Sequence, residues 1–154
     1  MYKRIVVGTD GSASANIAVD AAIELARVTG ATLHVVNAHR VTNPFQLAST
    51  PEVSVPIDAI VASNEAIQAE AGRVCDQVVE RAGAAGVHAE GHCVAGDAAE
   101  ALLKVAEDTE CDLLVVGNRG MSGVRRFMLG SVPNKLSHHS PSSLLIVDTA
   151  SARA

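Results

Sequence analysis

The feature that most constrains this chain is the regular return of short apolar runs rich in Val, Ile and Leu. Their length and branching are typical of strands buried on both faces. The predicted strands are residues 5–7, 32–38, 87–94, 113–116 and 143–147. Helical periodicity fills residues 15–26 and 58–85, Asp97 can cap another helix, and a last one is expected over residues 131–139.

Strands that alternate with helices form parallel sheets with right-handed crossovers. The sequence therefore predicts one α/β domain over residues 1–150, with a doubly wound, Rossmann-like, five-stranded parallel sheet and a tail at 151–154. If the first and fourth strands are neighbours, the strand order is 3-2-1-4-5. Ligands bind such sheets beyond the carboxyl ends of the strands, where the winding reverses. The turns at residues 8–12 and 117–131 would then flank one crevice.

The connection after the fourth predicted strand, residues 117–131, reads GNRGMSGVRRFMLGS and contains no acidic residue. Its glycines let backbone N–H groups approach a ligand closely. Pro133 indicates a first helical turn with Ser131 as N-cap, and the amino end of a helix attracts anions. The loop therefore favours phosphate binding, although a glycine-rich connection can also be a plain tight turn.

Charge and aromatic content exclude several classes of partner. The net charge of -5 argues against a nucleic-acid backbone or an anionic membrane, and 2% aromatic residues leave few platforms for stacking bases. Within this acidic chain, residues 117–139 hold Arg, Lys and His but neither Asp nor Glu. A locally basic segment suits a small anionic ligand better than a polymer.

Three cysteines without a C-x-x-C pair indicate neither a disulfide framework nor a zinc site, so reduced, structural cysteines are expected. The first apolar run is too short for a signal peptide and no stretch approaches the length of a membrane span. We therefore expect a cytoplasmic protein.

Known catalytic templates do not fit the sequence. The loop lacks the Gly-x-Ser-x-Gly order of a nucleophile elbow, and the chain lacks the lysine motif of P-loop hydrolases. Adjacent His138 and His139 project in different directions from a helix and are interpreted as helix-end residues rather than metal ligands. No catalytic residue and no metal ligand is predicted from these templates.

Asp10 and Arg119 can each be interpreted either as a ligand contact or as a residue without a binding role. Asp10 can accept hydrogen bonds from ribose hydroxyls or help to hold Mg²⁺, or it can merely cap the first helix, as Ser12 also could. Arg119 can contact phosphate or lie solvated on the surface.

The spacing of Gly117, Gly120 and Gly130-Ser131 resembles the nucleotide-loop signature of the universal stress protein family. The resemblance extends over nearly the whole chain, including the opening IVVGTDGS and the run CDLLVVG before the loop. It implies a doubly wound sheet, dimers paired through the last strand and, in one subclass, ATP binding. Ala99 near a frequent family proline and Ser142-Ser143 before the last strand depart from the pattern without touching the loop.

The resemblance also implies which residues bind ATP, with Mg²⁺ as a possible companion. Adenine would lie against backbone at the end of the second strand, and ribose and phosphates would meet the first turn and the glycine loop. The implied residues are Gly8, Thr9, Asp10, Val35, Val36, Gly117, Asn118, Arg119, Gly120, Met121, Ser122, Gly123, Gly130, Ser131, Val132 and Pro133.

We therefore expect a stress-response protein that binds ATP, or another adenine nucleotide, as a regulatory ligand and hydrolyses it slowly at most. A nucleotide-cleaving or adenylate-forming enzyme and a nucleotide-free dimeric scaffold remain alternatives. Residues 144–147 are apolar on both alternating faces and form a sheet edge in the expected order. An undefended apolar edge invites pairing, so a homodimer through this strand is predicted.

Overall fold

A computed structural model of the chain describes residues 1–49, 52, 54–118 and 129–150. Its core is a five-stranded parallel sheet in the order β3-β2-β1-β4-β5, which confirms the predicted topology. The strands are β1 (Arg4–Gly8), β2 (Thr32–His39), β3 (Ala89–Ala95), β4 (Leu113–Gly117) and β5 (Ser143–Val147).

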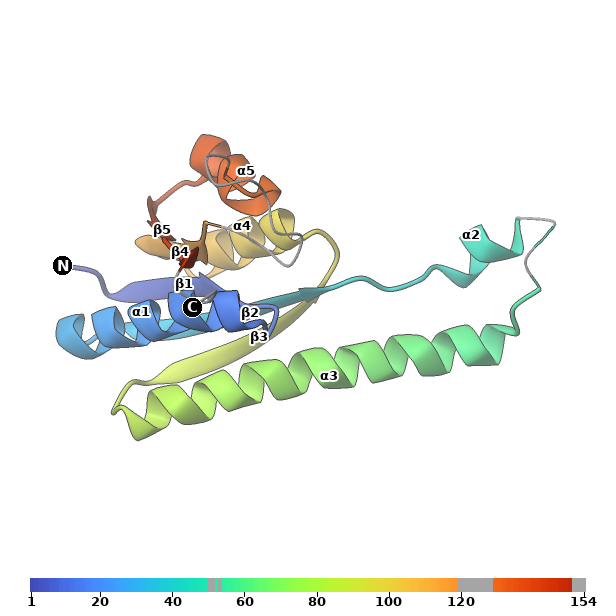
Figure 1. The fold of residues 1–154 in the computed structure, drawn as a ribbon, viewed down its shortest axis with the longest axis horizontal. Coiled ribbons are helices and arrows are strands. Elements are labelled where there is room, and N and C mark those ends of the chain that lie inside the picture. Colours follow the sequence, from blue (N-terminus) through green and yellow to red (C-terminus); the bar gives the residue numbers. More distant parts are fainter. Residues whose placement is uncertain (50–51, 53, 119–128, 151–154) are drawn as a thin grey trace.

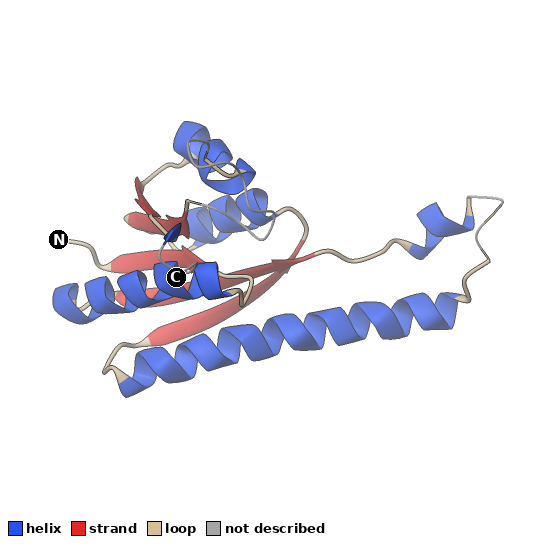
Figure 2. Ribbon diagram, in the orientation of Figure 1, coloured by secondary structure: helices blue, strands red, loops and turns tan. Residues whose placement is uncertain are grey.

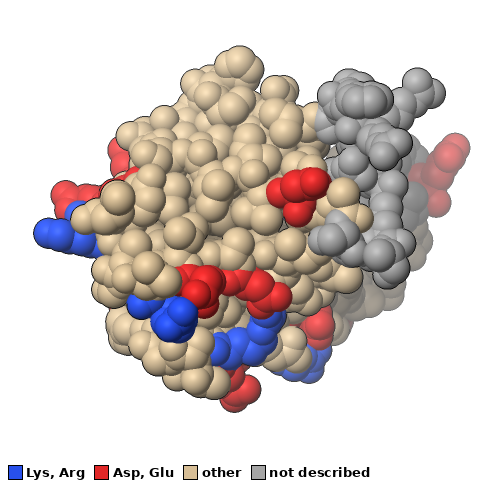
Figure 3. Space-filling view, turned by 60° about the vertical axis from the view of Figure 1, so that its left-hand side comes forward, with Lys and Arg blue, Asp and Glu red and all other residues tan. Residues whose placement is uncertain are grey.

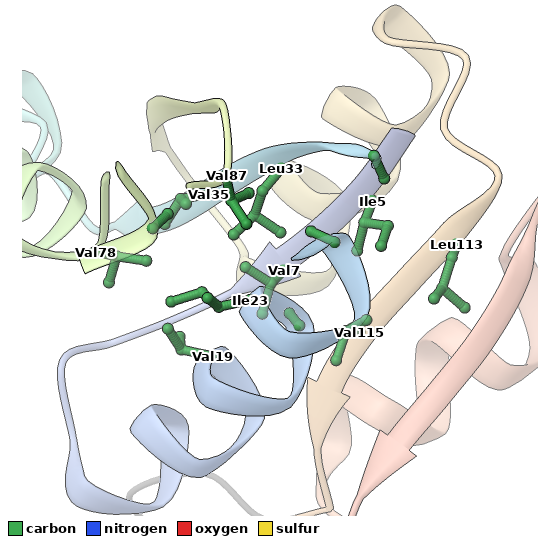
Figure 4. Packing of buried hydrophobic residues seen from close by; sticks show 14 of the residues in the cluster. Ile5, Val7, Val19, Ile23, Leu33, Val35, Val78, Val87, Leu113 and Val115 are labelled. Carbon is green, nitrogen blue, oxygen red and sulfur yellow. The ribbon is translucent and has the colours of Figure 1, made fainter. Parts of the chain in front are cut away.

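Helices cover both faces of the sheet (Figures 1 and 2). One face carries α1 (Ala13–Thr29) and α3 (Ile57–Ala84), and the other carries α4 (Ala98–Asp108) and α5 (Ser131–His139). Odd-numbered strand residues such as Ile5, Val7 and Val35 pack under α1 and α3 (Figure 4). Even-numbered ones such as Val6 and Val36 pack under α4 and α5, as the period of two in a strand requires.

Local signals set most helix ends where the sequence predicts them. Ser12 caps α1 by accepting from the N–H of Ala15, and Gly30 ends it with φ 72°. Asp97 caps α4 through the N–H of Glu100, and His139 is the last residue of α5. The helix-end prediction for His138 and His139 is thus confirmed.

Other boundaries differ from the predictions. The segment between the second predicted strand and the helix predicted over residues 58–85 contains a short helix α2 (Pro44–Ala48), which Asn43 caps by accepting from the N–H of Phe45. The third strand begins at Ala89 rather than at residue 87, because Gly86 adopts φ 77° and ends the preceding helical segment. α3 continues well past the edge of the sheet (Figure 1). Asn64 of α3 holds the returning chain there by donating to and accepting from the Thr42 backbone at 2.9 Å.

None of the described helices combines the length and apolar character needed to cross a lipid bilayer.

Candidate functional site

A pocket lies beyond the carboxyl ends of β1 and β4, where the winding of the sheet reverses. This is the position at which open α/β sheets bind ligands. Its walls come from the turn after β1, the end of β2, the start of α4 and the start of α5. The lining residues are Gly8, Thr9, Asp10, Ala15, Val36, Ala38, Ala98, Leu102, Val116, Gly117, Gly130, Ser131, Val132 and Pro133.

The turn after β1 forms the polar side of the pocket. The backbone N–H of Thr9 donates to Val36 O at 2.9 Å, which ties the turn to β2, and Thr9 Oγ1 accepts from Gly11 N at 3.1 Å. Asp10 Oδ1 accepts from Ser12 N at 2.9 Å. The carboxylate of Asp10 therefore stabilises its own turn, while Ser12 rather than Asp10 caps α1. Asp10 is also exposed at the pocket rim, where its carboxylate can meet a ligand.

Gly8 packs closely against α4 behind this turn. A Cβ added to Gly8 would stand 3.0 Å from Leu102 Cδ1 and 3.2 Å from Leu102 Cδ2. A side chain at position 8 would therefore require the end of the Leu102 side chain to shift.

The amino end of α5 forms the opposite side of the pocket. The N-cap of this helix is Gly130, so the predicted N-cap role of Ser131 is wrong, and Ser131 is the first helical residue. The helix starts one residue early because Gly130 has the extended backbone of a cap, with φ -59° and ψ 165°. Among the residues that the structure describes, no side chain caps this helix. Its first N–H groups, at Ser131 and Val132, lie at the pocket end of the helix, where N–H groups of a first helical turn can receive an anion.

The apolar side of the pocket comes from Val36 and Ala38 of β2 together with Ala98 and Leu102 of α4. Sequence reasoning selected the backbone at Val35 and Val36. Val36 lines the pocket, and the side chain of Val35 lies in the core under α1 and α3. Sequence reasoning named neither Ala38, which the period of two places on the face of Val36, nor Ala98 and Leu102. This apolar wall can accept one face of a planar ring.

Asn118 has a structural position rather than a place in the pocket lining. Its Nδ2 donates to Asp148 Oδ1 at 2.9 Å, and its Oδ1 accepts from Thr149 N at 3.1 Å and Thr149 Oγ1 at 2.8 Å. Its backbone N–H donates to Val147 O and its carbonyl accepts from Gly130 N. Asn118 thus joins the end of β4, the end of β5 and the cap of α5.

The remaining predicted loop residues lie outside the described residues. They are Arg119, Gly120, Met121, Ser122 and Gly123, together with Arg125 and Arg126.

Lys135, the described cation of the basic segment, faces α4. Its Nζ lies 3.1 Å from Glu100 Oε1 and 3.4 Å from Asp97 Oδ1. The N–H of Glu100, followed by the Lys135 ammonium, holds the pKa of Asp97 below its usual value. Lys135 therefore serves the α4 cap rather than the pocket, which it does not line.

A family model described as the universal stress protein family matches residues 1–148. The chain belongs to this family. It is 33% identical over 147 residues to the universal stress protein YxiE of Bacillus subtilis, covering 96% of this chain and 99% of the relative. This establishes the family from the sequence along nearly its full length.

Solved structures of similar chains agree with the fold. A universal stress protein in complex with cAMP superimposes with a TM-score of 0.70 at 33% identity, covering 97% of this chain and 98% of the other. A family protein from Arabidopsis thaliana with AMP bound gives 0.65 at 12% identity, covering 95% and 91%. The second likeness shows the fold alone.

Proposed function

We propose that this universal stress protein binds an adenine nucleotide, with ATP as the preferred ligand, as a regulatory signal in a stress response in the cytoplasm. The observation that carries the proposal is the pocket at the reversal point of the sheet. It joins the uncapped amino end of α5 and the Asp10 turn on its polar sides to an apolar wall from β2 and α4. That combination matches a phosphate, a ribose and a base.

Each part of the pocket has a separate task in this proposal. The N–H groups of Ser131 and Val132 and the positive end of the α5 dipole receive phosphate oxygens. Asp10 accepts from the ribose hydroxyls or holds Mg²⁺ beside the phosphates. The base lies between Ala38 and Leu102, where both available surfaces are apolar. The 33% identical family member solved in complex with cAMP supports an adenine ligand.

Isothermal titration with ATP, AMP and cAMP, each with and without Mg²⁺, tests the proposal. We expect ATP to bind with the highest affinity, and Asp10→Ala to weaken it by about 1–3 kcal/mol, the cost of unmade hydrogen bonds. Asp10→Asn keeps an acceptor for Ser12 N but removes the charge, so a loss confined to Mg²⁺-containing titrations would assign Asp10 to the metal.

Asp108→Ala is the matched control, because it removes one exposed carboxylate paired with Lys104 at the far end of α4. Absence of heat with every nucleotide at millimolar concentration would contradict the proposal. Equal binding of ATP by the wild type and by both Asp10 variants would reduce Asp10 to its role in the turn.

We also propose a homodimer through β5. This strand is the outer one on the β4 side of the sheet, and residues 144–147 are partly buried, packing alternately against the two hydrophobic clusters on either face. The upper part of the face in Figure 3, at the level of α5 in Figure 1, shows few charged side chains. An apolar outer strand that pairs with only one neighbour in the described sheet supports pairing with a second copy.

Light scattering on Ile146→Pro tests the dimer, since proline removes a backbone donor from the strand. We expect monomer or aggregate from this variant and an unchanged dimer from Ile146→Val, which keeps the backbone. A folded, dimeric Ile146→Pro protein would place the interface elsewhere.

A further inference from the structure

A cluster of metal-ligating side chains lies on the sheet apart from the pocket. Glu90 and His92 occupy alternate positions of β3, so their side chains share one face of the strand, and His88 lies one residue before it. The register pairs His34 of β2 with Glu90. His34 is two residues before Val36 in β2, so its side chain lies on the same face of the sheet, the face covered by α4 and α5.

The ligand atoms of His34, Glu90 and His92 are already close together. His34 Nδ1 lies 3.1 Å from His92 Nε2 and 3.7 Å from Glu90 Oε2. The three candidate ligand atoms all lie within 4.8 Å of one another. Two nitrogen ligands about 2.05 Å from a tetrahedral zinc ion stand about 3.3 Å apart. The separation of the two histidine nitrogens thus already matches that of coordinated ligands.

His88 extends the cluster. Its Nε2 lies 3.4 Å from Glu90 Oε1, the second oxygen of the same carboxylate. With 73% of its side chain exposed, His88 can turn toward an ion bound at the other three residues.

Burial gives the cluster a fixed base and an open side. The His34 side chain is 8% exposed, whereas that of Glu90 is 53% exposed. α4 packs mainly against β1 and β2, so the β3 side of this face stays accessible to an ion from solvent. Burial, followed by the neighbouring His92 ring, lowers the pKa of His34.

The charges around the cluster permit a cation. Arg4 of β1 is close enough to disfavour protonation of His34, but its guanidinium lies 3.2 Å from Glu110 Oε2. Glu90 supplies a negative charge directly at the cluster. Together these carboxylates offset the cationic neighbour.

We propose that His34, Glu90 and His92 form a binding site for a divalent transition-metal ion of the Zn²⁺ class, with His88 as a fourth ligand. Imidazole nitrogens with one carboxylate suit Zn²⁺, Co²⁺ or Ni²⁺, whereas Mg²⁺ and Ca²⁺ prefer oxygen ligands. None of the four residues lines the nucleotide pocket. The ion would tie the outer strand β3 to β2, so its binding stabilises this side of the sheet.

The test is titration of the untagged, metal-free protein with Zn²⁺ alone, and with Co²⁺ followed by visible absorption, both without nucleotide because nucleotides bind metal ions. We expect one Zn²⁺ per chain, an intense tetrahedral Co²⁺ spectrum and a higher melting temperature with Zn²⁺. Removing outer-shell partners of metal sites costs 10–100-fold in affinity, so His92→Ala and Glu90→Gln should each cost at least about tenfold.

The double variant His138→Ala/His139→Ala is the control, because it removes two exposed histidines from the end of α5 and should leave Zn²⁺ affinity unchanged. Far-UV circular dichroism checks that each variant is folded. Should Glu90→Gln misfold, the folded His88→Ala variant still must show a changed Co²⁺ spectrum.

Unchanged Zn²⁺ affinity in folded His92→Ala and Glu90→Gln would overturn the proposal. So would an octahedral Co²⁺ spectrum, or loss of binding only in the His138/His139 control. In each case the contact between His34 and His92 would be a hydrogen bond between two imidazole rings and nothing more.

Discussion

Replacing Asn118 by alanine separates an anchoring role from a ligand-binding role at the start of the glycine loop. In the structure the Asn118 amide holds the end of β5 through Thr149 N, Thr149 Oγ1 and Asp148 Oδ1. Thr149 is only 3% exposed, so water cannot readily replace the lost acceptor. Alanine would leave two donors of Thr149 without a partner.

The expected cost follows from these two donors. A buried polar group left unsatisfied costs about 1–3 kcal/mol, and the exposed hydrogen bond to Asp148 adds little. We therefore expect Asn118→Ala to lower the free energy of unfolding by about 2–4 kcal/mol in urea denaturation without nucleotide. For a chain of this size the melting temperature should fall by on the order of 10 °C.

Two further variants identify the cause. Asn118→Asp keeps an acceptor for Thr149 and should lose less stability than Asn118→Ala. Thr149→Val removes the hydroxyl, so adding Asn118→Ala to it should cost about 1 kcal/mol less than in the wild type. A loss below about 0.5 kcal/mol in Asn118→Ala, combined with weaker nucleotide binding, would refute the anchoring role and make Asn118 a ligand contact.

Two other predictions concern turn and cap residues. Gly11 and Gly30 both have positive φ, but a Cβ on Gly11 would meet Val74 Cγ2 at 3.1 Å while one on Gly30 meets nothing within 4 Å. In urea denaturation Gly30→Ala should therefore cost about 1–2 kcal/mol from backbone strain alone, and Gly11→Ala should cost more. Asp97→Ala should cost about 1 kcal/mol at pH 7 as a lost cap. Because the Glu100 N–H lowers the pKa of Asp97, this difference should shrink as the pH falls below the ordinary Asp pKa of about 3.9 and through the lowered pKa of Asp97, and a constant difference would exclude the carboxylate as its source.

The strand order could be predicted because each strand signal is local and the connections obey handedness rules. The position of the pocket followed from that order, since both glycine-bearing turns come directly after β1 and β4. The sequence could not decide which residue is the N-cap of α5, because Gly130 and Ser131 are both good cap residues. The backbone dihedrals of Gly130 decide it.

The cysteine prediction shows what sequence separation hides. All three cysteines are free, as expected, but Cys75 and Cys93 lie far apart in sequence while their sulfurs are 3.8 Å apart. Burial, followed by the nearby Cys93, raises the pKa of the Cys75 thiol to about 12. Cys75 is therefore an unreactive core residue, which agrees with the structural role predicted for it.

The histidine cluster was missed because its formation depends on register. His34 and Glu90 are partners only because β2 pairs with β3 as it does. A slip by one residue would turn one partner to the opposite face of the sheet. Sequence alone contains the alternation of His88, Glu90 and His92, which is a signal for one strand face, but not the strand that lies beside it.

The two proposed sites share one sheet face and should nevertheless act separately. His34, Val36 and Ala38 occupy alternate positions of β2 and lie on one face of the sheet. His34 belongs to the histidine cluster, whereas Val36 and Ala38 belong to the pocket wall. Positions two apart in a strand are separated by about 6.6 Å, which is too far for one ligand contact to serve both sites. Glu90 lies on β3, which contributes no residue to the pocket lining. Glu90→Gln should therefore weaken Zn²⁺ binding while leaving nucleotide affinity unchanged, and Asp10→Ala should do the reverse.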